Sequence, residues 1–128
     1  KEIDFKISKN GIAIRMKEKL LFDLGKADIK PSASPILKKI GALAKGWPNN
    51  IRVEGHTDNL PIHTLQFPSN WELSAIRAIN VVHFLQDQCQ VSPTKIYSIG
   101  YGENRPLVPN DSPDNRSKNR RVEIYLEK

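Results

Sequence analysis

Apolar and polar residues alternate along several short segments of the chain, and this two-residue period is the pattern of half-buried strands. Two such segments flank Asn10-Gly11, a dipeptide that favours a two-residue hairpin turn. Turn residues bound the other segments, and the last of them lies close to the C-terminus. The sequence therefore predicts strands over 3–7, 12–16, 51–54, 96–102 and 122–126, with the first two forming a hairpin.

A different spacing, with apolar residues three or four positions apart, predicts two helices. The first begins at Ser34-Pro35, because proline is favoured at the first helical position, and it ends by Gly46. The second begins at Ser69-x-x-Glu72, a capping box in which each side chain satisfies a backbone N–H group of the other residue. It ends near residues 88–90. The buried stripes expected from the spacing are Ile36, Leu37, Ile40, Leu43 and Ala44 in the first helix, and Trp71, Ala75, Ala78, Val82 and Leu85 in the second.

Strands that alternate with two helices predict an α/β (α+β) two-layer sandwich, in which both helices pack on one mixed sheet. The last two strands are expected to form a hairpin-like pair, which argues against a purely parallel sheet. The segment 105–117 between them contains three prolines and is expected to be a surface loop. A length of 128 residues suits one domain with its own core.

Polar side chains give the second helix a candidate binding face. Three of them share one side of its first turns, near the positive end of the helix dipole: Asn70, Ser74 and Arg77. The strand 51–54 ends at Gly55 and delivers Thr57 and Asp58 to the loop that follows, a region where ligands bind in sheets with crossover helices. We therefore expect Asp58 and Arg77 to share a socket for a small group that carries both an amine and a carboxylate.

Composition and charge add three expectations. The hydrophobic content is 38%, and no apolar run approaches the roughly 20 residues of a membrane span. The formal net charge of +6 has three possible explanations. It keeps the domain soluble, or it attracts an anionic polymer as partner, or it attracts a nucleic acid. The single cysteine, Cys89, has no partner for an internal disulfide and is expected to be a small packed residue. Because the chain begins at Lys1, we expect a fragment or a processed product whose anchor lies upstream.

Four separated segments occur in a fixed order along the chain: GHTDN, SNWELSAIRA, IGYGENRP and NRRVEIYLE. Together they resemble the OmpA-like peptidoglycan-binding domain, from about Phe22 to Leu126. The loop between Asp58 and Asn70 is longer than in short outer-membrane members and carries Pro61, His63, Phe67 and Pro68. In this fuller form, EGHTDNLPI…FPSNWELS, the chain resembles the periplasmic domain of flagellar stator B subunits of the MotB/PomB type.

The resemblance implies a single OmpA-like domain, 1–128, with a β-α-β-α-β-β core over 22–128 and an N-terminal hairpin extension over 1–21. It implies non-covalent binding of peptidoglycan through the diaminopimelate of the stem peptide, with neither enzymatic activity nor a cofactor. Asp58 would accept from the ligand's ammonium, and Arg77 would take its carboxylate bidentately. Thr57, Asn70 and Leu73 match motif positions that shape the pocket. Three further residues are weaker candidates for ligand binding: Ser74, Asn119 and Arg120. Arg120 could instead only brace the loop or the edge of the sheet.

The resemblance also implies partners and a location. The chain would form a homodimer, would anchor a flagellar motor stator to the cell wall, and would join a stator A subunit through a membrane segment absent from this sequence. It would be the periplasmic domain of an inner-membrane protein. An alternative is a general outer-membrane or lipoprotein peptidoglycan tether.

Two other functions remain as alternatives. A metal-dependent wall hydrolase would need a set of metal ligands, and His56 next to Asp58 could be a pair of them. However, His63 and His83 lie at no ligand spacing, and no second carboxylate is expected to cluster with this pair. A nucleic-acid binder would use the basic residues near the C-terminus, which lack interleaved aromatic residues. These basic residues are Arg116, Lys118, Arg120 and Arg121.

Overall fold

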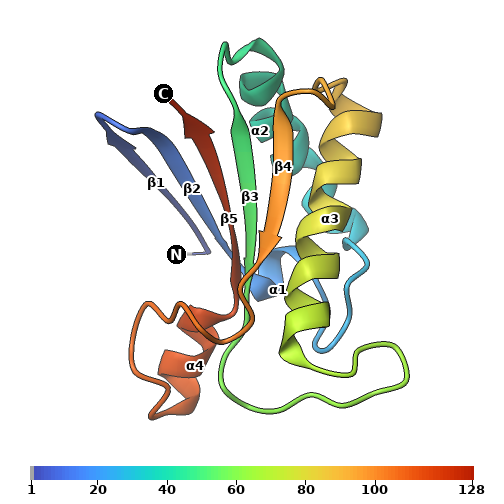
Figure 1. Cartoon of the computed structure of the whole chain (residues 1–128), viewed down its shortest axis with the longest axis vertical. Coiled ribbons are helices and arrows are strands. Elements are labelled where there is room, and N and C mark those ends of the chain that lie inside the picture. Colours follow the sequence, from blue (N-terminus) through green and yellow to red (C-terminus); the bar gives the residue numbers. More distant parts are fainter. Residues whose placement is uncertain (1) are drawn as a thin grey trace.

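One five-stranded sheet forms the centre of the protein in the computed structural model, which describes residues 2–128 (Figure 1). The strands are β1 (Ile3–Ser8), β2 (Gly11–Lys17), β3 (Ile51–His56), β4 (Ile96–Gly100) and β5 (Arg121–Glu127). The helices are α1 (Glu18–Leu21), α2 (Ser34–Gly46), α3 (Asn70–Cys89) and α4 (Pro113–Asn119), with a 3-10 turn η1 (Pro31–Ala33) before α2. Among residues 2–128, none of these helices combines the length and the apolar character that crossing a membrane requires.

The sheet is mixed, which confirms the predicted α/β class. Its order is β1-β2-β5-β3-β4, and β3 is parallel to β4 while the other neighbours are antiparallel. The predicted pairing of the last two strands is wrong, because β5 inserts between β2 and β3 and leaves β4 at the far edge. With β2 as the first strand, the elements β2-α2-β3-α3-β4-β5 follow the expected β-α-β-α-β-β order. However, β2 lies within residues 1–21, outside the predicted core 22–128, and α1 and α4 are additional helices.

The N-terminal hairpin is confirmed, with a shift of one residue in its turn. Ser8 pairs with Gly11, so Lys9 and Asn10 occupy the turn, and Gly11 adopts a φ of 122° that favours glycine. The division into an extension 1–21 and a core 22–128 stays a prediction, and β2 joins the two parts because it pairs with β5. Lys1, the first residue of that extension, lies outside the described residues.

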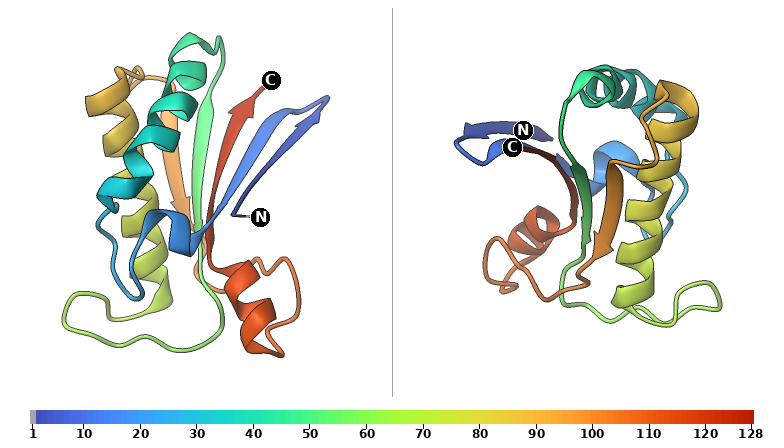
Figure 2. Two further views of the ribbon diagram at one scale, coloured as in Figure 1. Left: turned by 180° about the vertical axis from the view of Figure 1, so that it is seen from behind. Right: turned by 45° about the horizontal axis from the view of Figure 1, so that its top comes forward.

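Helices α2 and α3 cover the same face of the sheet, and the core lies between them and the strands (Figure 2). The core includes Val53 and Ile124 from the strands, Leu37 and Ile40 from α2, and Leu85 from α3. The stripe predicted for α2 holds at its centre, although Leu43 is exposed. Cys89 is buried against α2, as its expected packing role requires.

The buried face of α3 differs from the predicted one. Trp71 is 56% exposed, whereas Asn70, Ser74 and Arg77 are all buried. The full set of buried residues in α3 is Asn70, Leu73, Ser74, Arg77, Ala78, Val81, Leu85 and Cys89. An apolar stripe marks the buried face of a helix only where the surroundings of that face are apolar. In the first turns of α3 the buried side chains are mainly polar, and hydrogen bonds satisfy them. At the start of α3, the Ser69 hydroxyl accepts from the N–H of Trp71, not from that of Glu72 as the capping box predicts.

Two glycines let α3 approach the sheet closely. A Cβ atom on Gly55 of β3 would lie 2.1 Å from the carbonyl oxygen of Ser74, and one on Gly100 of β4 would lie 2.5 Å from the backbone nitrogen of Ala75. The contacts of both glycines therefore set the position of the first turns of α3 against the ends of β3 and β4. This close approach brings the polar residues of α3 beside the loop that carries Asp58.

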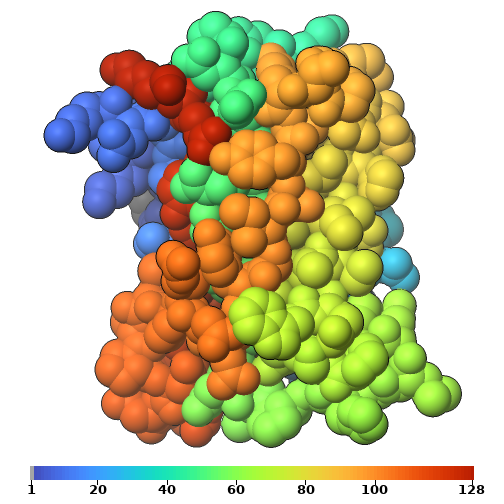
Figure 3. Space-filling view, in the orientation of Figure 1, coloured from blue at the N-terminus to red at the C-terminus, as the bar shows by residue number. Residues whose placement is uncertain are grey.

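The predicted surface loop 105–117 is wrong in its second half, where α4 begins at Pro113. The Ser112 hydroxyl caps this helix by accepting from the N–H of Asn115. Ser112-Pro113 is the same helix-start signal as Ser34-Pro35 before α2. The prolines that precede it favour a loop, and they led to the wrong prediction for this segment. Figure 3 shows that the segment leading into α4 and the loop between β3 and α3 form the same end of the molecule.

Candidate functional site

A pocket of about 400 Å³ lies beyond the end of β3. Four parts of the chain line it: α1 and the loop after it, the loop between β3 and α3, the first turns of α3, and the residue that precedes β5. Asp58 and Arg77 both belong to this lining, as the sequence predicts. The lining residues are Glu18, Leu24, Gly25, Thr57, Asp58, Leu60, Pro61, Ile62, Asn70, Leu73, Arg77 and Arg120.

Arg77 is held by three acceptors at the base of the pocket and is only 3% exposed. Its Nη1 donates to Oε2 of Glu18 at 2.6 Å, and its Nε donates to the carbonyl oxygen of Lys26 at 2.7 Å. Its Nη2 donates to the carbonyl oxygen of Asp23, and the guanidinium stacks on the ring of Phe22 at 4.7 Å. Burial lowers the pKa of Arg77 and Glu18 acts in the opposite sense, but an arginine stays charged in proteins. Arg77 therefore fixes the loop 23–26 as well as facing the pocket.

Asp58 is buried and is joined to Arg77 through two other side chains. Its Oδ1 accepts from the N–H of Leu60 at 3.0 Å, and its Oδ2 accepts from Nη1 of Arg120 at 2.7 Å. The Nε of Arg120 in turn donates to Oε1 of Glu18 at 2.9 Å. Burial lowers the pKa of Arg120, but its bonds to Asp58 and Glu18 outweigh burial and raise it above the ordinary value. The four side chains form one chain of ion pairs, which we call the pocket network: Asp58–Arg120–Glu18–Arg77.

The other predicted residues divide into two groups. Thr57, Asn70 and Leu73 line the pocket, where Asn70 also donates to the carbonyl oxygen of Leu60 at 3.0 Å and so holds the loop. Ser74 and Asn119 are buried outside it. Ser74 accepts from the N–H of Gly102, and Asn119 accepts from the N–H groups of Leu107 and Val108. These two residues brace loops, while the ligand-binding roles of the pocket residues stay predictions.

Glu18 is the charged lining residue that no sequence pattern selects. It lies between Lys17 and Lys19, directly after a strand, where a solvated charge is the ordinary expectation. In the structure it is 8% exposed, because α1 turns its side chain inward toward Arg77 and Arg120. Only the tertiary arrangement shows this burial, since no local pattern distinguishes Glu18 from a surface glutamate.

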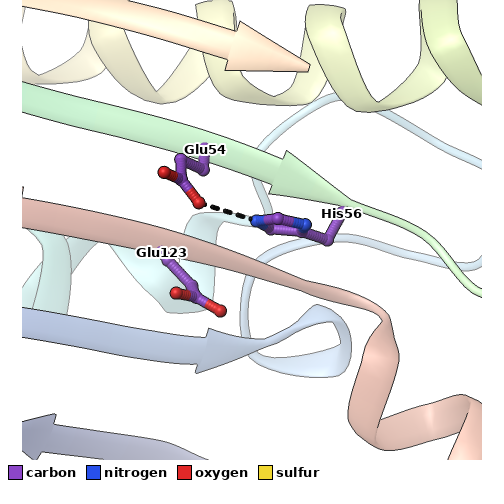
Figure 4. Close-up of side chains that lie close together, drawn as sticks. All are labelled: Glu54, His56 and Glu123. Carbon is purple, nitrogen blue, oxygen red and sulfur yellow. Dashed lines mark hydrogen bonds and ion pairs between the residues drawn. The ribbon is translucent and has the colours of Figure 1, made fainter. Parts of the chain in front are cut away.

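A second polar cluster lies on the sheet face that α2 and α3 leave uncovered. Glu54 and His56 alternate with core residues of β3, and Glu123 faces them from β5, directly opposite Glu54 in the register (Figure 4). The Nε2 of His56 lies 2.9 Å from Oε1 of Glu54, and one ligand atom from each of the three residues falls within 4.8 Å of the others. The prediction that no second carboxylate clusters with His56 is therefore wrong, because Glu54 lies beside it on β3 and strand pairing brings Glu123 to it from β5.

Arginines give this cluster a structural role. Nε of Arg52 donates to Oε2 of Glu54 at 2.7 Å, and Nε of Arg121 donates to Oε2 of Glu123. Two guanidiniums thus already balance the two carboxylates, so a divalent cation would face repulsion as well as competition for its oxygen ligands. We assign the cluster to the stability of the uncovered sheet face.

The same cluster predicts a loss of stability in acid. Burial alone would raise the pKa of Glu54 and of Glu123, but hydrogen bonds outweigh it: His56 and Arg52 lower the pKa of Glu54, and Tyr125 and Arg121 lower that of Glu123. A carboxyl group with a lower pKa in the folded state stabilises the fold at neutral pH, and this stabilisation disappears as pH falls through the lowered values. The free energy of unfolding, measured in urea at a series of pH values, should therefore decrease below about pH 4.

The variant Glu123→Gln tests the assignment. It should be less stable than the wild type at neutral pH, and its free energy of unfolding should fall less steeply in acid, because one of the two shifted carboxyls is gone. An acid slope equal to that of the wild type would show that Glu123 does not contribute to it.

Comparisons with known proteins agree with this architecture. The family described as the OmpA family matches residues 21–120. Motility protein B of Bacillus subtilis is 38% identical over 98% of this chain and 48% of its own length. The chain spans about half the length of the curated relatives it matches.

Two solved structures share this fold over nearly the whole chain. The periplasmic domain of Helicobacter pylori MotB (residues 78–256) has a TM-score of 0.86 and 32% identity, and the match covers 96% of this chain and 80% of that one. The cell wall anchor of the T6SS from Pseudomonas aeruginosa has a TM-score of 0.91 and 28% identity, over 99% and 89% of the two chains. None of these relatives is named as an enzyme. The resemblance found in the sequence motifs is confirmed, and the chain belongs to the OmpA family.

Proposed function

We propose that this chain binds cell-wall peptidoglycan non-covalently, through the diaminopimelate of the stem peptide. The observation that carries the proposal is the pocket network, in which Asp58 and Arg77 line one small pocket together with a second acid and a second base. The similarity to MotB and to a protein described as a cell wall anchor supports the same ligand class.

The chemistry of the ligand matches the pocket. The free end of diaminopimelate carries an ammonium and a carboxylate on one carbon. Asp58 accepts from the ammonium, while the N–H groups of Arg77 that are not used by Glu18, Lys26 and Asp23 donate to the carboxylate. Thr57, Asn70 and Leu73 hold the walls of the pocket.

We expect one pocket to bind one stem peptide only weakly. A charged hydrogen bond contributes about 1.5–3 kcal/mol, whereas association costs about 4 kcal/mol or more. Because Asp58 is already bonded to Arg120, the ligand exchanges one bond for another instead of adding one. A wall polymer presents many identical stem peptides. In a homodimer, binding of one pocket would raise the effective concentration of stem peptides at the second pocket and so increase the overall affinity.

In the whole protein, this module would anchor a flagellar motor stator to the wall. The similarity to Motility protein B and to the periplasmic domain of MotB supports this role, a periplasmic location, attachment to the inner membrane and a stator A subunit as partner. The similarity to the T6SS cell wall anchor favours a second candidate, a peptidoglycan tether of another envelope assembly. Both candidates use the same pocket.

Sedimentation with insoluble peptidoglycan tests the binding. Asp58→Asn should weaken co-sedimentation by about tenfold or more, because the ammonium loses a charged acceptor. Asp87→Asn is the matched control, since Asp87 is an exposed acid of α3 far along the helix from the pocket, and it should sediment like the wild type. Circular dichroism and thermal unfolding check that both variants are folded. Equal sedimentation of a folded Asp58→Asn variant would refute the proposed site.

A further inference from the structure

Glu18 has a position that the proposed binding mode does not use. Its two carboxylate oxygens each accept from a different guanidinium, Oε2 from Arg77 at 2.6 Å and Oε1 from Arg120 at 2.9 Å. It is 8% exposed and lines the pocket. The charged residues of the lining are thus Glu18 and Asp58 against Arg77 and Arg120, and their formal charges sum to zero.

We propose that Glu18 is the residue that determines the charge specificity of the pocket. By neutralising one of the two arginines, it makes the pocket select a ligand end that carries both an ammonium and a carboxylate over one that carries a carboxylate alone. This inference rests on the proposed function, because it concerns the selectivity of the same pocket.

The physical reason is the cost of an unbalanced charge in a buried site. A zwitterionic ligand end adds one positive and one negative charge, so the pocket with its ligand stays neutral. A ligand end with only a carboxylate would leave one negative charge without a partner. Without Glu18 the pocket would carry one excess positive charge, and the carboxylate alone would then become the balanced ligand.

Arg120 links the two acids in this scheme. In the structure its Nη1 donates a hydrogen bond to Oδ2 of Asp58, an oxygen to which the ammonium of the ligand would also donate. Its second bond, to Glu18, keeps Arg120 in the pocket when an ammonium replaces it on Asp58. Nη1 of Arg120 then becomes free to donate to the ligand's carboxylate. Glu18 therefore positions Arg120 for the exchange as well as balancing its charge.

A purely structural role for Glu18 leads to a different expectation. A brace that only holds Arg77 and Arg120 in place would affect every ligand of the pocket alike when it is removed. A residue that sets the charge balance would instead change the ratio of affinities for ligands of different charge. The experiment therefore measures a ratio and not one affinity.

The test compares meso-diaminopimelate with pimelate, the same seven-carbon diacid without amines, by titration monitored with NMR. The wild type should prefer meso-diaminopimelate, and in Glu18→Gln the ratio of the two affinities should shift toward pimelate by about tenfold or more. Asp28→Asn is the matched control, because Asp28 is an exposed acid of the loop between α1 and η1 and does not line the pocket. This variant should keep the wild-type ratio.

Two further variants keep the inference falsifiable if Glu18→Gln folds poorly. Arg120→Gln leaves the pocket with an excess negative charge, so binding of 1,5-diaminopentane should strengthen relative to that of pimelate. The double variant Glu18→Gln/Arg120→Gln restores neutrality and should regain the preference for meso-diaminopimelate. Thermal unfolding establishes which variants are folded.

The outcomes separate the two proposals. A wild-type chain that does not bind meso-diaminopimelate overturns the proposed ligand and this inference with it. A wild type that binds it, together with folded Glu18→Gln and Arg120→Gln variants that keep the wild-type ratios, overturns the inference alone. A shifted ratio in Glu18→Gln that returns in the double variant supports it.

Discussion

Arg77→Ala should lower the free energy of unfolding by about 3–5 kcal/mol and abolish sedimentation with peptidoglycan. The substitution leaves the buried carboxylate of Glu18 without its partner at 2.6 Å and removes the donors that hold the carbonyl groups of Lys26 and Asp23. Urea unfolding at neutral pH measures the change in stability. Gln88→Ala is the control on the same helix, because Gln88 is exposed and its loss should be nearly neutral.

A double-mutant cycle identifies the source of this cost. If the cost comes from the unpaired charge of Glu18, Arg77→Ala should be less destabilising in a Glu18→Gln background than in the wild type, by about 1 kcal/mol or more. Additive effects of the two substitutions would contradict the ion pair as the cause and leave the contacts with the loop 23–26 as the explanation.

Gly55→Ala should destabilise the fold by about 3 kcal/mol or more, near the upper end of the cost of overpacking. The added Cβ atom would lie 2.1 Å from the carbonyl oxygen of Ser74. The Cβ position is fixed by the backbone of β3 and the oxygen belongs to the backbone of α3, so neither atom can rotate away. Helix α3 would have to move off β3, and the pocket residues on its first turns would move with it. Thermal unfolding and sedimentation with peptidoglycan should both report the loss.

The control for this prediction is Gly46→Ala. Gly46 is the last residue of α2, and an added Cβ atom would meet nothing within 4 Å. That substitution should leave the fold unchanged or stabilise it by about 0.4–1 kcal/mol, since alanine restricts the unfolded chain. Equal stability of Gly55→Ala and the wild type would mean that α3 does not depend on close contact with β3.

Local signals in the sequence were sufficient for the five strands, for α2 and α3, and for several members of the pocket. Strand alternation, the Asn10-Gly11 turn and the Ser34-Pro35 start each depend on neighbouring residues, and the structure contains the elements they predict. The strand–loop–helix segment around Asp58 and Arg77 also predicted a shared pocket, because its parts are close along the chain.

The remaining features depend on contacts between distant segments. The buried position of Glu18 requires α1 to lie beside Arg77 and Arg120, which come from α3 and from the end of α4. The cluster of Glu54 with Glu123 requires β5 to pair with β3, an order of strands that no local pattern specifies. The buried face of α3 differs from the predicted one for a related reason, because polar side chains are buried at one end of this helix and its apolar spacing does not mark that face.

That division along α3 has a consequence for how the helix opens. Its first turns bury mainly polar groups such as Asn70 and Ser74, whose bonds reach loops, whereas its later turns bury Val81 and Leu85 in the apolar core. Local opening is easier where few apolar contacts must separate. Amide protons in the first half of α3 should exchange with solvent deuterium sooner than those in the second, so the pocket occupies the half of the helix that a bound ligand can still make more rigid.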